Sequence, residues 1–289
     1  MVSSSESPVD VTVAGLFSYP VKGCRVIAHD RADVLVSGLR HDREWMVVDV
    51  RHSPAQFLSQ RECPAMATLS VELVDAGSLL LRQGDARPHV VPPPAKHALL
   101  KVKVWSHETV ALDTGEAASR WLTDALAMPR GSLRLVRFHP DLRRPCSVLY
   151  AGDSGAHTFF ADGYPVLVSN TASLVDLNAR MSKRGVAALP MDRFRPNIVL
   201  DGLPAWDEDH VDLLRIGDVV LRLAKPCVRC QVTTTDQQSG ARISDEPLHT
   251  LASFRNNPDF GGVTFGWNAV VLQPGSVSAG ATVAAEYRF

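Results

Sequence analysis

The sequence predicts a mixed α+β protein that is mostly β, with a β-barrel-like N-terminal domain followed by a second β-rich domain. Two observations favour this fold class: short β-favouring runs alternate with turns along most of the chain, and helical periodicity is confined to a few stretches. With 289 residues, of which 45% are hydrophobic, the chain is long enough for one large domain or two ordinary ones.

The first hundred residues contain β-favouring runs separated by turns. Such spacing without long helical patterns is typical of a small, mostly antiparallel barrel. A Pro-rich stretch at 87–94 is interpreted as a loop rather than a linker between domains. The expected strands cover residues 11–19, 32–36, 45–50, 67–73, 78–82 and 99–105.

The pattern changes after Asp113-Thr114, a pair that can cap a helix. Apolar residues then recur at helical spacing until Pro129, and a strand is expected at 133–138. The polar stretch 139–145 contains proline and arginine and is the expected boundary region. The chain is therefore expected to divide into domains at 10–140 and 141–289.

A strand-to-helix junction is the clearest feature of the second domain. Residues 164–168 favour a strand, and Ser169-Asn170-Thr171 supplies a capping residue for a helix with Leu174, Leu177 and Met181 on one face. Free backbone N–H groups at such a junction point toward whatever lies above the strand. Further strands are expected at 197–200, 218–224, 231–235, 269–273 and 281–286, with a short helix around 247–255.

Bulk composition excludes several function classes. The formal net charge is −1, and the 30 basic residues are scattered, so the sequence predicts no nucleic-acid binding. No run of eighteen apolar residues occurs and the first eight residues lack the features of a signal peptide, which predicts a cytoplasmic protein that is not inserted in a membrane. Five cysteines are too sparse for a disulfide framework.

The segment 225–236, KPCVRCQVTTTD, places two thiols three residues apart beside two cations. Because a β-favouring run precedes it, a strand would deliver a soft thiolate to an electropositive place. Cys227 and Cys230 could instead be half of a zinc site, a thioredoxin-like dithiol or inert buried thiols. The sequence offers no second Cys or His pair for zinc, and the strand expected after Cys230 does not suit a dithiol motif. The residues alone leave a functional thiolate and inert burial open.

Three cations stand in unusual local contexts: Lys22 in YPVKG, Arg43 in DREW and Arg195 in FRPN. Singly, each is more often a surface charge than a ligand. Together they would clamp a phosphate, because arginine binds phosphate through two parallel hydrogen bonds and lysine binds it as a point charge. The GDSG stretch at 152–155 is interpreted as a glycine-rich loop, and the sequence has no HExxH, Walker or GxGxxG pattern.

Seven segments occur in the order typical of one known family. They are YPVKG, GLRHDREWMVVD, FLSQRE, FADGYPVLVSNTASLVDLN, FRPNIVLDG, KPCVRCQVTTTD and FGWNAVV. The series resembles the MOSC (molybdenum cofactor sulfurase C-terminal) superfamily. It is most similar to the group that pairs a MOSC N-terminal β-barrel domain with a MOSC domain, which includes the mitochondrial amidoxime-reducing components and their bacterial relatives. The resemblance covers about residues 10 to 289 and implies that the second domain is a MOSC β-barrel with peripheral helices.

This resemblance implies a molybdenum cofactor (Mo-molybdopterin), a pyranopterin dithiolene whose metal also takes one protein thiolate. The matching metal ligand is Cys230, with Cys227 as a neighbour and with Arg229 or Lys225 helping to keep the thiolate deprotonated. Gly23 stands where the family often has serine, so one hydroxyl donor is missing. The family also carries an association with pyridoxal phosphate binding. The matching cofactor-binding positions are Lys22, Gly23, Arg43, Ser169, Asn170, Thr171, Ser173, Arg195, Asn197, Thr234 and Thr235.

The implied reaction is a two-electron reduction of a hydroxylated nitrogen, as in amidoximes, hydroxylamines or N-hydroxylated nucleobases. Cys230 is the implied catalytic ligand, and Asp236 is a candidate proton relay whose alternative is a turn aspartate at the end of a strand. Trp206 and Trp267 could stack a planar substrate.

A separate soluble electron-transfer protein with a flavin, haem or iron–sulfur group is the expected partner, because no cysteine-rich iron–sulfur segment follows the last expected strand. The main alternative function is a MOSC sulfur-carrier or pterin-binding protein without N-reductase activity, in which Cys230 would accept a persulfide. A binding module with a decayed site is the third possibility.

Overall fold

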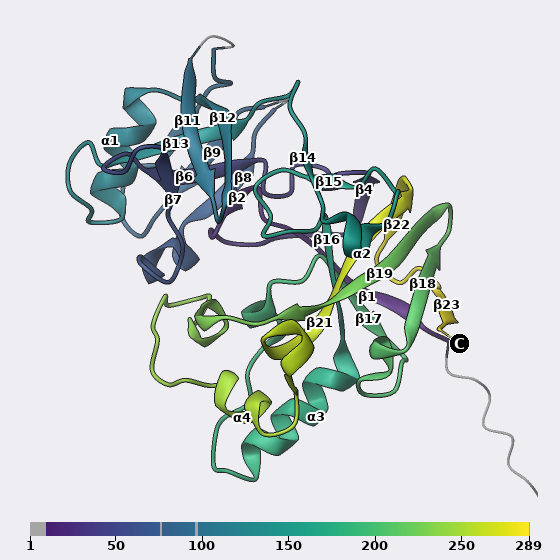
Figure 1. Ribbon diagram of the computed structural model, residues 1–289. Coiled ribbons are helices and arrows are strands. Elements are labelled where there is room, and N and C mark those ends of the chain that lie inside the picture. Colours follow the sequence, from purple (N-terminus) through teal and green to yellow (C-terminus); the bar gives the residue numbers. More distant parts are fainter. Residues whose placement is uncertain (1–9, 76, 96–97, 289) are drawn as a thin grey trace, which may run out of the picture.

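A computed structural model describes residues 10–75, 77–95 and 98–288, and Figure 1 shows that they form two lobes. Most of the regular structure in these ranges is strand, as predicted, and the helices are short. None of the helices described here combines the length and the apolar character needed to cross a membrane. The helices are α1 (Glu116–Ala125), α2 (Val148–Ala151), α3 (Thr171–Ser182) and α4 (Leu248–Ala252), and the 3₁₀ turns are η1 (Pro64–Thr68), η2 (Met191–Phe194), η3 (Asp207–Asp209), η4 (Gln231–Thr234) and η5 (Pro258–Phe260).

The first lobe contains a closed barrel of five strands. These are β13 (Leu133–Phe138), β12 (His107–Asp113), β11 (Leu99–Val104), β7 (Ala55–Phe57) and β6 (Trp45–Asp49), in pairing order. β6 pairs back onto β13 and so closes the ring, and β2 (Val21–Lys22) joins β6 in parallel. The barrel predicted for this part of the chain is therefore confirmed. A separate sheet contains β8 (Ser70–Leu73), β9 (Leu79–Arg82) and β10 (His89–Val91).

Strand β6 shows why this barrel is stable. Its sequence WMVVD is buried along its whole length, with Trp45 and Val47 in one apolar cluster and Met46 and Val48 in another. Alternate side chains of a strand point to opposite faces, so one strand contributes to two cores. The cluster around Trp45 also takes in Leu122 of α1, which packs the helix against the sheet.

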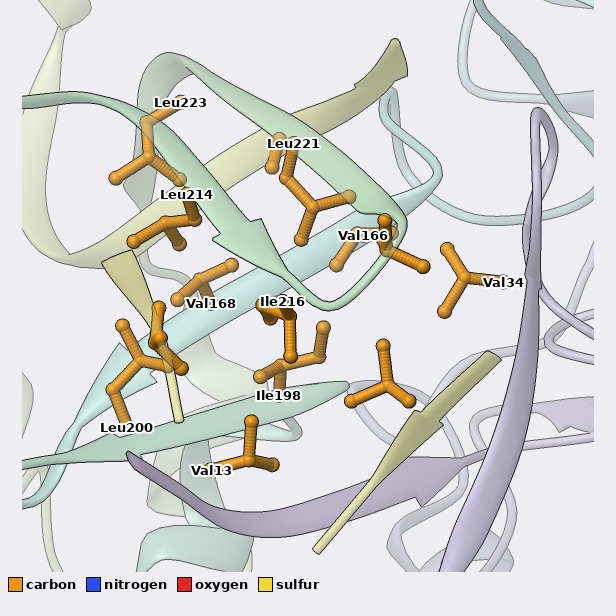
Figure 2. Close-up of a cluster of buried hydrophobic side chains, with 14 of the residues drawn as sticks. Val13, Val34, Val166, Val168, Ile198, Leu200, Leu214, Ile216, Leu221 and Leu223 are labelled. Atoms are coloured by element: carbon orange, nitrogen blue, oxygen red, sulfur yellow. The ribbon is translucent and has the colours of Figure 1, made fainter. Parts of the chain in front are cut away.

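The second lobe is a nine-stranded sheet that curves around one apolar core. Figure 2 shows Val13, Val166, Ile198, Leu214 and Leu221 gathered between its strands, and all of them are buried. In pairing order the strands are β23 (Ala284–Tyr287), β18 (Val211–Ile216), β19 (Val219–Val228), β21 (Gly262–Gln273), β16 (Val166–Asn170), β17 (Ile198–Asp201), β1 (Thr12–Ser18) and β3 (Ile27–His29), with β20 (Asn256–Asn257) on β21.

The start of the chain ties the two lobes together. β1 pairs with β17, and β4 (Arg31–Leu35) pairs with both β5 (Gly38–Leu39) and β22 (Gly275–Ser278), so early strands complete sheets of the second lobe. β2 leaves that lobe and joins the barrel, which places the YPVKG segment between the lobes. β14 (Arg144–Pro145) lies in the predicted boundary region and pairs with β15 (His157–Thr158), which lies beyond it. The division near residue 140 stays a prediction.

Most predicted elements are confirmed, and four local predictions are wrong. The strand expected at 231–235 is the 3₁₀ turn η4, the stretch 87–94 expected as a loop contains β10, and residues 67–68 belong to η1 rather than to a strand. The N-cap of α1 is Gly115, and neither Asp113 nor Thr114 caps the helix with its side chain. The helix predicted after Ser169 is confirmed as α3, and the Asn170 side chain caps it by accepting the Ala172 N–H at 3.3 Å.

Candidate functional site

A cleft between the lobes brings together the three predicted cations and both cysteines of the KPCVRC segment. It opens to solvent. Six predicted site residues line it, namely Lys22, Gly23, Arg43, Arg195, Asn197 and Cys230. The other lining residues are Ser59, Gln60, Ala161, Asp162, Tyr164, Leu167, Phe194, Cys227, Val228, Arg229, Val232, Thr233 and Asn268.

Lys22 enters the cleft from β2 and is neutralised there. Its ammonium lies 2.5 Å from Asp162 Oδ1, and the same oxygen accepts the Trp105 Nε1–H at 3.0 Å. Burial raises the pKa of Asp162, but Lys22 and the indole hydrogen bond outweigh it and hold that pKa below the ordinary aspartate value. Asp162 is therefore a carboxylate that compensates the charge of Lys22.

Gly23, the residue after Lys22, has a backbone conformation that suits glycine. Its φ is +81°, and an added Cβ would lie 3.1 Å from Met66 Cε. A serine, which the resemblance leads one to expect, would therefore need both a strained backbone and a shift of Met66.

Tyr19 separates two of the three arginines that line the cleft, Arg43 and Arg195. The Cζ atoms of Arg43 and Arg195 lie 4.2 and 4.1 Å from the centroid of its ring. Both arginines have left-handed backbone angles, with φ of +47° and +54°, a region that few non-glycine residues adopt. Burial raises the pKa of Tyr19 to about 12, so its phenol stays neutral between the cations. Such backbone strain is concentrated at functional sites, which fits the place of both arginines.

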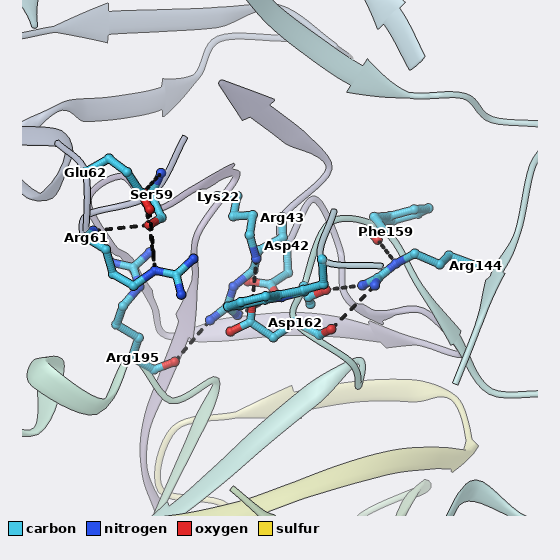
Figure 3. Close-up of polar contacts among 12 residues, drawn as sticks. Lys22, Asp42, Arg43, Ser59, Arg61, Glu62, Arg144, Phe159, Asp162 and Arg195 are labelled. Atoms are coloured by element: carbon cyan, nitrogen blue, oxygen red, sulfur yellow. Dashed lines mark hydrogen bonds and ion pairs between the residues drawn. The ribbon is translucent and has the colours of Figure 1, made fainter. Parts of the chain in front are cut away.

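The two arginines differ in how their charge is compensated. Arg43 Nη1 lies 2.6 Å from Asp42 Oδ2, and its Nη2 donates to the Arg195 carbonyl at 3.1 Å (Figure 3). Arg195 donates to Gln237 Oε1 at 3.0 Å and to Cys24 O at 2.8 Å, and both acceptors are neutral. Within the described residues no carboxylate pairs with Arg195, although only 9% of it is exposed. A buried cation without a counter-ion costs free energy, so this part of the cleft favours an anion.

The two cysteines have different surroundings. Cys230 follows β19, precedes η4 and is exposed, whereas Cys227 is half-buried. Arg229 Nη1 lies 2.8 Å from the Cys227 sulfur, and Lys225 Nζ lies over two aromatic rings, 4.9 and 5.4 Å from their centroids. These contacts do not match the expectation that Arg229 or Lys225 accompanies Cys230. Cys230 is therefore the accessible thiol, and Cys227 is the one paired with a cation.

Turn η4 changes which threonine faces the cleft. Thr233 lines it, and its Oγ1 donates to the Cys230 carbonyl at 3.0 Å. Thr234 and Thr235 are buried and outside the lining, and Thr234 Oγ1 donates to Gln231 O at 2.8 Å. The prediction assumed the alternation of a strand, which a 3₁₀ turn does not have. The predicted cofactor contacts of Thr234 and Thr235 have no support from these positions.

Asp236 caps a turn outside the cleft lining. Its Oδ1 accepts the Ser239 N–H and Oγ–H, each at 2.8 Å, and its Oδ2 lies 2.9 Å from Arg193 Nη2. The hydrogen bonds from Ser239 hold the pKa of Asp236 below its ordinary value. The contacts match the turn-aspartate alternative, and a group held as a carboxylate is a poor proton donor near neutral pH.

The predicted junction between β16 and α3 is occupied by protein groups and does not line the cleft. Ser173 Oγ donates to the Glu208 carboxylate at 2.7 and 2.8 Å, and Asn170 Nδ2 donates to it at 3.2 Å. Thr171 hydrogen-bonds another carboxylate, and Ser169 is fully buried. Asn170 therefore caps the helix and, with Ser173, bonds the buried Glu208, whereas Thr171 bonds the exposed Asp201. The Ser169 hydroxyl has no partner among the described residues. The predicted cofactor contacts of these four residues have no support here.

Glu208 predicts a pH dependence of stability. Burial raises the pKa of this carboxyl, which is 1% exposed, above its ordinary value. A raised pKa in the folded state stabilises the fold below the ordinary pKa, about 4.3, and this contribution is lost as pH rises through the folded value. The difference in free energy of unfolding between wild type and Glu208→Gln should therefore shift against the wild type as pH rises from 4 to 8. Urea denaturation across this range checks it, and parallel curves would contradict it.

Several lining residues were missed in the sequence, although each lies in a segment that carries the resemblance. Gln60 belongs to FLSQRE, Asp162 to FADGYP and Asn268 to FGWNAVV. Those segments were the available signal, but side-chain direction decides which of their residues face the cleft. Trp206 and Trp267 do not line it: the Trp206 indole donates to Asp176 at 2.8 Å and the Trp267 indole to Asp209 at 2.7 Å.

Comparisons with known proteins bear on both lobes. A family model described as the MOSC N-terminal beta barrel domain matches residues 10–129, and one described as the MOSC domain matches residues 156–284. Mitochondrial amidoxime-reducing component 1 of Mus musculus is 35% identical over 255 residues, covering 84% of this chain and 71% of that protein. The protein of the same name in Homo sapiens is 33% identical over 283 residues, covering 93% of this chain and 81% of its own length.

Proposed function

The chain belongs to the MOSC family whose members carry an N-terminal MOSC β-barrel domain, and on that premise we propose that it is a molybdenum-cofactor-dependent oxidoreductase. Its substrates would be N-hydroxylated compounds such as amidoximes, hydroxylamines or N-hydroxylated nucleobases, reduced by two electrons. The names of its relatives, amidoxime-reducing components, support this substrate class. The observation that carries the proposal is the exposed Cys230 thiol in one cleft with Lys22, Arg43 and Arg195.

The cleft fits an anionic pterin cofactor in two respects. The buried Arg195 has only neutral partners, and Arg229 Nε is buried without a partner among the described residues. An exposed thiol is a soft donor that suits molybdenum bound to dithiolene sulfur.

Each end of the cleft would hold a different part of the cofactor. Cys230 would bind the metal, and Lys22, Arg43 and Arg195 would hold the phosphate end. When bound, the cofactor supplies two-electron oxygen-atom transfer. Protons for the reduced nitrogen and the released water would come from solvent, since the cleft is open. Pyridoxal phosphate stays an expectation of the resemblance alone.

The chain's own residues fix the thiol relative to the cations. Arg193 Nη1 donates to Thr234 O at 3.1 Å, and its Nη2 pairs with Asp236 at 2.9 Å, which fastens η4 to η2. Arg229 Nη2 donates to the carbonyl of Phe194, the residue before Arg195. The segment that carries Cys230 and the segment that carries Arg195 are therefore bound to each other. Such supporting contacts hold the side chains of a site at fixed positions relative to one another.

We extend the proposal to the electron donor and the location of the protein. The cleft residues offer no redox group of their own that could store two electrons beyond the cysteine thiols. A separate soluble protein with a flavin, haem or iron–sulfur group would return the electrons, and the protein would work in the cytoplasm. Neither a nucleic acid nor a membrane has a part in this proposal.

The test is a combined metal and activity measurement. Protein purified from a host that makes molybdopterin should contain about one molybdenum per chain, and after reduction by dithionite it should convert benzamidoxime to benzamidine. Protein from a host that cannot make molybdopterin is the control. A preparation that contains molybdenum and shows no turnover would overturn the reductase function, and metal-free protein with a persulfide on Cys230 would establish the sulfur-carrier alternative.

A further inference from the structure

Two glutamine amides from different lobes meet beside Arg195. Gln60 follows β7 of the barrel and is 0% exposed, and Gln237 follows η4 and is 6% exposed. Their side chains form two reciprocal hydrogen bonds: Gln60 Nε2 donates to Gln237 Oε1 at 3.0 Å, and Gln237 Nε2 donates to Gln60 Oε1 at 2.9 Å. Gln237 Oε1 also accepts from Arg195 Nη1 at 3.0 Å, so the pair is the support on which this guanidinium rests.

The orientation of both amides is fixed by neighbours that can play only one hydrogen-bonding role. A guanidinium only donates, so the Gln237 atom that faces Arg195 must be the oxygen. Backbone carbonyls only accept, so the nitrogen of Gln237 faces Thr235 O at 3.0 Å and the nitrogen of Gln60 faces Gly23 O at 2.7 Å. Every contact is satisfied in this one arrangement, which makes the pair a rigid support rather than an adaptable one.

The Gln60–Gln237 pair is neutral, so it leaves the positive charge of Arg195 in the cleft uncompensated. Lys22 is compensated by Asp162, and Arg43 is compensated by Asp42. Among the described residues, the lining cations without a carboxylate partner are Arg195 and Arg229. The acceptors of Arg195 are an amide oxygen and a carbonyl. A carboxylate at position 237 would have the same length and would pair with Arg195, but it would cancel that charge and lose the two N–H donors.

We propose that Gln237, fixed by Gln60, is a positioning residue that holds Arg195 as an uncompensated cation and thereby sets the affinity of the cleft for a phosphate or pyrophosphate group. The inference rests on the proposed function only in assuming that the natural ligand has such an anionic end. It assigns a role to a contact between lobes: the barrel residue Gln60 determines how a cation of the second lobe is presented.

The test uses inorganic pyrophosphate and full-length protein from a host that cannot make molybdopterin. Isothermal calorimetry should show binding by the wild type and a Kd raised at least tenfold in Gln237→Glu. Gln237→Met removes the hydrogen bonds without adding charge and should raise the Kd about threefold, because Arg195 keeps its bond to Cys24 O. Gln238→Glu, one residue along the chain and exposed, adds the same charge and should change the Kd less than threefold. Circular dichroism verifies that each variant is folded.

A second readout is the pterin retained by the same variants from a host that makes molybdopterin, which should fall in the same order. Three results would each overturn the inference. The first is an equal Kd for Gln237→Glu and the wild type, and the second is an equal increase of the Kd in Gln237→Glu and Gln237→Met. The third is that the wild type does not bind pyrophosphate. Failure of the inference can be told apart from failure of the proposed function. If the wild type contains molybdenum and turns over substrate, but substitutions at position 237 have no effect, only the inference is refuted. If pyrophosphate binding depends on Gln237 but the wild type contains no molybdenum, only the reductase function is refuted.

Discussion

Cys230→Ala should purify with less than about a tenth of the wild-type molybdenum and should reduce benzamidoxime at the background rate. Cys230 is the exposed thiol of the cleft, and among the described residues nothing hydrogen-bonds to its sulfur, so the sulfur is free to bind a metal. Loss of a direct ligand removes the bond itself, which no neighbouring side chain restores. Molybdenum by mass spectrometry, pterin by fluorescence and single-turnover kinetics measure the three consequences separately.

Cys227→Ala is the matched control, three residues away in the same cleft. Its sulfur contacts Arg229 Nη1 at 2.8 Å, so its loss should loosen the guanidinium and lower activity about tenfold, the range found for residues that support a metal ligand. Molybdenum content should stay above half of the wild-type value. The reverse order, with metal lost in Cys227→Ala and kept in Cys230→Ala, would show that the ligand assignment is wrong.

The segment after Cys230 shows where prediction of the fold from sequence fails. Val232, Thr233, Thr234 and Thr235 favour a strand by composition, yet the chain turns here. The reason is local: Thr233 Oγ1 donates to Cys230 O at 3.0 Å and Thr234 Oγ1 to Gln231 O at 2.8 Å. Side chains that bond to carbonyls three residues back stabilise a turn in place of a ladder. Where the apolar pattern is unambiguous, as in the continuous apolar run of β6 and the helical spacing of α3, the prediction is confirmed.

The candidate site divides in the same way. Lys22, Arg43, Arg195 and Cys230 could be chosen by residue type and motif, and the structure brings all four to one cleft. Their counter-ions and supports could not be chosen, because contacts such as Lys22 with Asp162 join residues 140 positions apart and depend on how the lobes pack. The predicted cofactor contacts at the junction after β16 have no support because a capping pattern indicates free backbone N–H groups but does not show which group accepts their hydrogen bonds.

Asp42→Asn should destabilise the protein by about 3 kcal/mol, because removing one partner of a buried ion pair leaves the other charge without compensation. Asp42 is 3% exposed, and its Oδ2 lies 2.6 Å from Arg43 Nη1. The asparagine can still accept the Tyr19 N–H, which Asp42 Oδ1 accepts at 2.9 Å, so the loss reports mainly the charge. Two uncompensated guanidinium groups would then lie on the same tyrosine ring.

An anion in the cleft should recover part of this loss. Phosphate that binds to the cations of the cleft favours the folded state, and it should do so more in Asp42→Asn than in the wild type because it also relieves the added repulsion. Urea denaturation in phosphate and in chloride of equal ionic strength measures the difference. Asp33→Asn is the matched control: its pair with Arg40, at 3.0 Å, has side chains 50% and 54% exposed, so it should cost at most about 1 kcal/mol and gain nothing from phosphate. If the two variants lost the same stability, or if phosphate stabilised them equally, Asp42 would not be the counter-ion that compensates Arg43.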